Sequence, residues 1–148
     1  MNLLNREHSP RFPIAFSLLA LGIAYAWAWL FPYTGEGDAI MHYLSAKAAW
    51  IDPSAALSAF ARPLHKLLYI FPVHLGYPYA RAFSGLITLA LLWQTYALAK
   101  DWNIQRPHLV LPLLFFQPFI FAMATDIMTE IPAALAILNP PAVPLTEP

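Results

Sequence analysis

Two carboxylates, Glu36 and Asp38, lie directly after a long apolar run, and a glycine precedes each of them. The run ends at Phe31-Pro32-Tyr33. A carboxylate can take a proton from a substrate hydroxyl, so acids at the end of a membrane-spanning segment are candidates for a general base. The plainer interpretation is structural. Asp38 would then cap a helix and contribute about 1 kcal/mol, while Glu36 would be a solvated loop charge.

A second acidic pair, Asp126 and Glu130, lies between two apolar runs. The two residues are one helical turn apart, so on a continuous helix they would share a face. Ionisable side chains at membrane depth are costly and are therefore candidates for function. The alternative is that Asp126 and Thr129 only cap a helix at the membrane surface.

The composition favours an integral membrane protein. Of the 148 residues, 59% are hydrophobic and 11% are charged, whereas soluble domains carry about 25% charged residues. The net charge is zero, which argues against a nucleic-acid partner because no basic patch is present to neutralise phosphates. The chain has no cysteine, so disulfide frameworks, thiol catalysis and zinc–thiolate sites are excluded.

The apolar runs predict an all-α membrane protein with about three transmembrane helices, at about 13–33, 81–99 and 108–125. Pro112 and Pro118 fall inside the third, where neighbouring helices can satisfy the freed carbonyls. Residues 131–138 begin a fourth crossing but are too short to span the hydrocarbon core, which needs about 20 residues. A proline-rich irregular tail, 139–148, follows. We therefore expect 1–148 to be a single truncated transmembrane region.

The basic residues predict the orientation. Arg6 and Arg11 precede the first span, and Lys100 and Arg106 lie between the second and third. The positive-inside rule places both segments in the cytoplasm, which makes 34–80 an extracytoplasmic loop of an inner or plasma membrane protein. Ala24-Tyr25-Ala26 has the small residues of a signal-peptide cleavage site, but the bulky aromatic residues after it favour an uncleaved span.

The 34–80 loop predicts short interfacial helices. A helix from Asp38 would end at Asp52-Pro53, a second would run over 54–61 and a third over 64–71. The first would carry two faces: Met41, Leu44, Ala48 and Ile51 on one, and Asp38, His42 and Ser45 on the other. Such helices lie in the membrane interface with the apolar face toward lipid or protein.

Three histidines of this loop, His42, His65 and His74, raise the question of a metal site. Their spacings match no known metal motif, and isolated histidines are more often packing or interfacial residues. The packing interpretation is therefore favoured over a three-histidine metal site.

The order of motifs resembles the N-terminal part of the GT-C superfamily of integral-membrane glycosyltransferases, over about residues 12–138. This superfamily includes protein O-mannosyltransferases and lipid A aminoarabinose transferases. Asp38 in Gly35-Glu36-Gly37-Asp38 matches the acid of the first loop. The stretch 61–69, with Arg62-Pro63-Leu64-His65, is similar to a His-Pro-Pro-Leu-like turn, although arginine replaces the usual histidine. Arg81 in 79–86 resembles an Arg-led second span, and Thr125-Asp126 to Glu130 resembles the acidic motif after the third.

The resemblance implies transfer of a sugar from a polyprenyl-phosphate carrier to an acceptor hydroxyl. Asp38 would be the catalytic base, with Glu36 as the alternative because Gly37 splits the acids. Substrate-binding roles would fall to the following residues: Arg62, His65, Lys66, Arg81, Asp126 and Glu130. A divalent cation is left open. Family members have many more spans, so the resemblance implies that these 148 residues alone are inactive without a missing C-terminal part.

A small non-enzymatic membrane protein that binds a partner or lipid is the main alternative. Asp38 would then be a cap, and Asp126 and Glu130 would make polar contacts between helices. A transporter fragment is less favoured, because transporter sites lie near the midplane rather than in a surface loop. The coding DNA downstream of Pro148 distinguishes these hypotheses.

Overall fold

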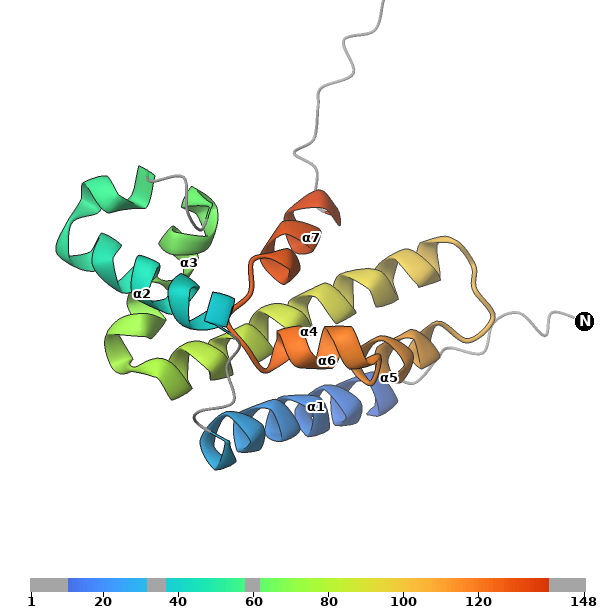
Figure 1. The fold of residues 1–148 in the computed structure, drawn as a ribbon. Coiled ribbons are helices and arrows are strands. Elements are labelled where there is room, and N and C mark those ends of the chain that lie inside the picture. Colours follow the sequence, from blue (N-terminus) through green and yellow to red (C-terminus); the bar gives the residue numbers. More distant parts are fainter. Residues whose placement is uncertain (1–10, 32–36, 58–61, 139–148) are drawn as a thin grey trace, which may run out of the picture.

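The computed structural model describes residues 11–31, 37–57 and 62–138, and every regular element in these ranges is a helix (Figure 1). The prediction of an all-α protein is confirmed. Glu36 and the tail 139–148 lie outside the described residues. The elements, in chain order, are α1 (Arg11–Leu30), α2 (Gly37–Ile51), η1 (Pro53–Leu57), α3 (Pro63–Leu75), α4 (Tyr77–Asp101), η2 (Pro107–Leu109), α5 (Val110–Phe115), α6 (Pro118–Ala124) and α7 (Glu130–Leu138).

Two helices, α1 and α4, are long and apolar enough to cross a membrane. They have 20 and 25 residues, which correspond to about 30 and 37 Å at 1.5 Å per residue. Helix α4 begins at Tyr77, earlier than predicted, because Pro78 occupies its first turn, where a missing N–H costs nothing. Arg81 therefore lies inside the helix and does not precede it.

The segment predicted as the third span is not one continuous helix. It consists of η2 with α5 and then α6, and the two parts are bent by 73° against each other. Gln117 adopts an extended backbone before Pro118, as residues before proline do. Its side chain accepts a hydrogen bond from the Ile120 N–H at 2.7 Å, so α6 starts afresh with its own cap. The part of the chain that the structure describes thus has two candidate spans, or three if the bent pair is one.

Helices α1 and α4 lie side by side and antiparallel (Figure 1), and small residues form their contact. Ala20, Ala24 and Ala28 are buried at intervals of one turn along α1. A Cβ built on Gly85 of α4 would lie 3.0 Å from the Ala24 Cβ. Close approach of small residues is how helices associate in membranes, where lipid competes for large apolar side chains.

The loop after α1 folds into the predicted helices α2 and α3. Helix α2 ends before Asp52-Pro53 as expected. Helix α3 is longer than expected and continues through Pro72 to Leu75. The expected helix over 54–61 is a short 3-10 helix, η1, as far as it is described. Their interfacial position stays a prediction.

Helix α2 packs on the protein by a face of small residues, and the predicted apolar face points away from the protein. Its buried residues are Ala39, Ala46 and Ala49, and α2 packs mainly on α3. Met41 and Leu44 are half exposed. The large apolar side chains therefore point toward the surroundings.

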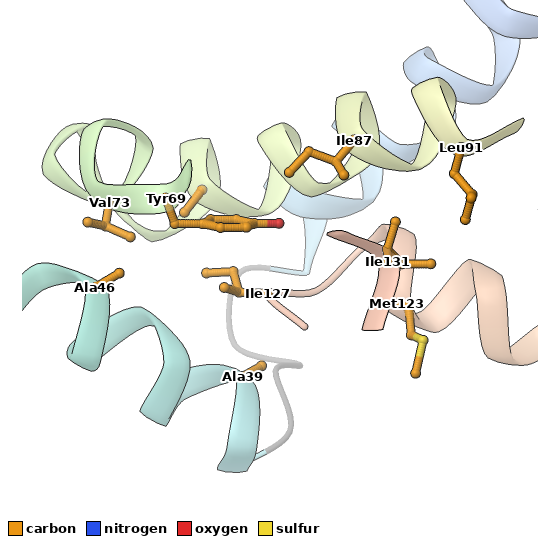
Figure 2. Close-up of a cluster of buried hydrophobic side chains, with 10 residues drawn as sticks. Ala39, Ala46, Tyr69, Val73, Ile87, Leu91, Met123, Ile127 and Ile131 are labelled. Carbon is orange, nitrogen blue, oxygen red and sulfur yellow. The ribbon is translucent and has the colours of Figure 1, made fainter. Parts of the chain in front are cut away.

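Asp126 and Glu130 do not share a helix face, contrary to prediction, because residues 125–129 form a turn between α6 and α7. Ile127 of this turn is fully buried. Figure 2 shows it between Tyr69 of α3 and the ribbon of α2 that carries Ala39. The turn is thus inserted into the core, and α7, which follows it, packs against α4.

Candidate functional site

Arg81 holds three segments together at the end of the protein where α1 stops and α4 starts. It is almost fully buried. Its Nε donates a hydrogen bond to the Thr125 carbonyl at 2.7 Å, and its Nη1 donates to the Phe31 carbonyl. The guanidinium therefore ties the end of α1 and the turn after α6 to α4. A buried arginine is tolerated where such acceptors surround it.

Asp126, also buried, faces the same region. Its Oδ1 accepts hydrogen bonds from the Tyr77 hydroxyl at 3.1 Å and from the Ile127 N–H at 2.9 Å. The ring of Tyr77 in turn lies 5.8 Å from the Arg81 Cζ. Sequence analysis did not select Tyr77. Its only signal was its place one turn before Arg81, on the same side of a helix.

Arg81, Thr125 and Asp126 line a cavity of about 240 Å³ whose other walls are apolar. The remaining lining residues are Trp27, Phe119, Phe121, Ala122, Met123 and Met128. A small pocket with a few convergent polar groups and apolar walls is typical of binding sites. This cavity, with its polar residues Arg81, Thr125 and Asp126, is therefore a candidate binding site.

Asp38 lies at the same end of the molecule and is exposed, in the first turn of α2. A carboxylate there is stabilised by the helix dipole. The next residue, Ala39, belongs to the same core cluster as Ile127, which follows Asp126 (Figure 2). Asp38 is exposed and Asp126 is buried, and the residues that follow them belong to one core cluster.

His42 and His65 form a second cluster next to Asp38. Their ring centroids are 5.2 Å apart, and His65 stacks on Tyr69 at 4.4 Å. Burial lowers the pKa of His42, Asp38 and then Glu130 act to raise it, and Arg62 acts to lower it. Arg62 immediately precedes α3 and Glu130 begins α7, so three helix starts bring charges to one histidine.

His65 is 2% exposed, and neither ring nitrogen hydrogen-bonds to any residue in the described part of the chain. Burial, together with the nearby His42 and Lys66, lowers its pKa to about 4. Burial also raises the pKa of Tyr69, whose hydroxyl shares a 2.6 Å hydrogen bond with Ser84 Oγ. This histidine is therefore a neutral ring inside the protein and does not face the exposed acid.

Lys66 is buried too, and its Nζ donates a hydrogen bond to the Ala55 carbonyl at 2.8 Å. This contact fastens η1 to α3. Of the cations predicted to bind substrate, Arg62 is the exposed one, whereas Lys66 and Arg81 bond to backbone carbonyls.

The three loop histidines do not converge. His74 packs against Trp50 at 4.6 Å, at the other end of the α2–α3 pair. Within 11–31, 37–57 and 62–138, no three acidic or histidine side chains are grouped so that they can hold a metal ion. A three-histidine site is not formed.

Comparison of the chain with protein-family models, with curated proteins and with solved structures found no match. The GT-C resemblance therefore depends on the motifs of this sequence alone.

Proposed function

We propose that the chain is the N-terminal part of a membrane glycosyltransferase that takes a sugar from a polyprenyl-phosphate carrier and transfers it to an acceptor hydroxyl. The observation that carries the proposal is an exposed carboxylate, Asp38, at the same end of two candidate spans as the buried Arg81–Asp126 cavity. A lipid-linked donor presents its sugar at the membrane surface, where a helix that follows a span has access to it.

The chemistry is a displacement at the anomeric carbon. The acceptor oxygen forms the new bond to that carbon as Asp38 takes its proton, and the bond to the carrier phosphate breaks with its electron pair staying on the phosphate. The leaving phosphate needs positive charge. Arg62, exposed at the start of α3, is suited to supply it, and a divalent cation is a further source.

Buried Asp126 has a supporting role in this proposal. Because it lines the cavity with Thr125 and is fixed by Tyr77, it is suited to orient the acceptor. Glu130 is exposed and acts electrostatically on His42, as Asp38 does. Glu36, outside the described residues, is the alternative base.

The proposal includes a topology. The N-terminus lies in the cytoplasm, the 34–80 segment is extracytoplasmic, and the membrane is the inner or plasma membrane. The proposed partners are membrane lipids, the polyprenyl-phosphate donor and further spans of the same protein.

The alternative, a small membrane protein that binds a partner or lipid, is favoured by one observation. Helices α1, α3 and α4 enclose an apolar groove of about 740 Å³. Its lining carries no charged residue, and it includes Leu18, Gly22, Phe71, Phe83 and Leu86. A surface of this kind suits contact with hydrocarbon or with another helix.

The decisive experiment compares two aspartates at opposite ends of α2. Membranes that contain the protein as its gene encodes it are assayed for sugar transfer from a radiolabelled polyprenyl-phosphate donor. Asp38→Asn should reduce transfer at least about 100-fold, because the proton acceptor is lost. Asp52→Asn is the matched control, since Asp52 is exposed and only accepts hydrogen bonds from Ser54.

Equal activity of the Asp38→Asn and Asp52→Asn variants would rule out Asp38 as the base, and a large loss in Glu36→Gln would then move the role to Glu36. A wild-type protein that transfers no sugar, but is captured with a membrane partner, would favour the non-enzymatic alternative.

A further inference from the structure

The contact between His42 and His65 joins α2 to α3 with two titratable rings. Small and apolar residues, such as Ala46 and Val73 in Figure 2, lie along the middle of this interface. The histidine pair, with ring centroids 5.2 Å apart, brings two rings that can take up a proton against each other, whereas His74 at the other end stacks on Trp50.

The charged groups near the two rings differ in sign. His42 has carboxylates near it, from Asp38 on its own helix and from Glu130 on α7, together with the cation Arg62. Among the described residues, the charged groups that act on His65 are Lys66 and His42, and its ring lies on the ring of Tyr69. As the pH falls, His42 therefore takes up a proton first, and the nearby carboxylates balance its charge. His65 takes up a proton at lower pH, and no described carboxylate acts on it.

The folded protein does not stabilise a protonated His65. The ring is 2% exposed, and no described residue accepts a hydrogen bond from it. A buried charge without a partner is unfavourable, and a protonated His42 across the interface adds like-charge repulsion. The cheapest relief is separation of the two helices, which brings water to both rings.

We propose that the His42–His65 contact is an acid-sensitive joint, at which α2 separates from α3 as the pH falls while α1 and α4 stay packed. Helix α2 carries Asp38 in its first turn, so the joint moves the exposed carboxylate relative to the rest of the fold. The proposal concerns the α2–α3 interface itself and does not depend on the function proposed above.

Distance measurements between spin labels test this directly. The chain has no cysteine, so labelled cysteines can be placed only where they are wanted. One pair, Lys47→Cys with Ala97→Cys, joins exposed positions of α2 and α4, and a reference pair, Leu67→Cys with Ala97→Cys, joins α3 and α4. The purified chain in detergent micelles is measured between pH 7.5 and pH 4.

The α2–α4 distance distribution should lengthen and broaden toward pH 4, and the α3–α4 distribution should stay constant. His65→Phe keeps an aromatic ring against Tyr69 but cannot take a proton, so it should hold α2 in place throughout. His74→Gln is the matched control. It removes the histidine at the other end of the same helix pair, where His74 stacks on Trp50, and it should open as the wild type does.

Three results would overturn the proposal. The first is a wild type that stays closed at pH 4. The second is a His65→Phe variant that opens as much as the wild type, which would assign the response to the carboxylates, and the third is loss of the response in His74→Gln. If His65→Phe is already open at pH 7.5, His42→Gln decides. Its opening must then move to lower pH or vanish, because the like charge is gone, and an unchanged midpoint contradicts the joint.

Discussion

The hydroxyl of Tyr77 donates a hydrogen bond to Asp126 Oδ1 at 3.1 Å, and this bond joins the first residue of α4 to the turn that follows α6. The two residues are far apart in the sequence, and together with Arg81 they form a polar cluster at one end of the helical bundle. The stability of the candidate site should therefore depend on a few polar side chains.

Tyr77→Phe should lower the free energy of unfolding by about 1–2 kcal/mol, because Asp126 keeps its burial but loses one of its donors. Tyr79→Phe is the control, since Tyr79 is 46% exposed and lies at the apolar groove. Thermal unfolding of both variants in the same detergent measures the difference. A midpoint for Tyr77→Phe no lower than that of Tyr79→Phe would show that the bond contributes nothing.

Arg81→Gln should destabilise the protein far more than Arg62→Gln. Loss of Arg81 leaves the carbonyls of Phe31 and Thr125 without their donor, with an expected cost of about 2–4 kcal/mol. Arg62 is exposed, and replacement of a surface charge changes stability by about 0.5 kcal/mol or less. Chemical denaturation in mild detergent separates the two cases, and equal midpoints would contradict the role given to Arg81.

Gly85 and Gly22 should respond oppositely to alanine. Gly22→Ala should be neutral or stabilising by up to about 1 kcal/mol, because alanine is the better helix former and a Cβ at Gly22 meets nothing within 4 Å. Gly85→Ala should destabilise, because its Cβ would lie 3.0 Å from that of Ala24. The double variant Gly85→Ala with Ala24→Gly should recover the loss, and failure to recover it would place the steric conflict elsewhere.

Stability should fall with acidification because of His65. Its pKa is held at about 4 in the folded protein against an ordinary value of 6.5, so the folded state binds the proton less readily than the unfolded state does. The contribution of the neutral ring is fully present above about pH 6.5 and is lost as the pH falls toward 4, with at most about 3 kcal/mol at stake. Unfolding midpoints between pH 7.5 and pH 4 should therefore fall less steeply for His65→Phe, and parallel curves would contradict this assignment.

The sequence predicted the helices better than it predicted their packing. Helices α2 and α3 followed from apolar runs ended by proline signals such as Asp52-Pro53. The buried face of α2 could not be found in this way, because lipid accepts large apolar side chains and close packing in a membrane uses small ones. Met41 and Leu44 therefore point outward while Ala39 and Ala46 point inward.

The helix break at Pro118 and the geometry of the candidate site could not be predicted from the sequence, because both depend on tertiary structure. A proline inside an apolar run is compatible with a kinked span, and only the backbone of Gln117 distinguishes a kink from a new helix start. Asp38 and Asp126 have buried neighbours, Ala39 and Ile127, in one core cluster, and the roles given to the two acids stay predictions. The hydrogen bond of Tyr77 to Asp126 and the contact of His42 with His65 could not be predicted from the sequence, because no local pattern joins those residues.

The two hydrogen bonds of Arg81 also have a consequence for the order in which the helices assemble during synthesis. Chains emerge N-terminus first during synthesis, so the Phe31 carbonyl is available to Arg81 as soon as α1 and α4 are both in place. The Thr125 carbonyl emerges only after a further stretch that includes α5 and α6. A hairpin of α1 and α4, held by the first of these bonds and by the alanine–glycine contact, can therefore form as an assembly intermediate on which the later helices dock.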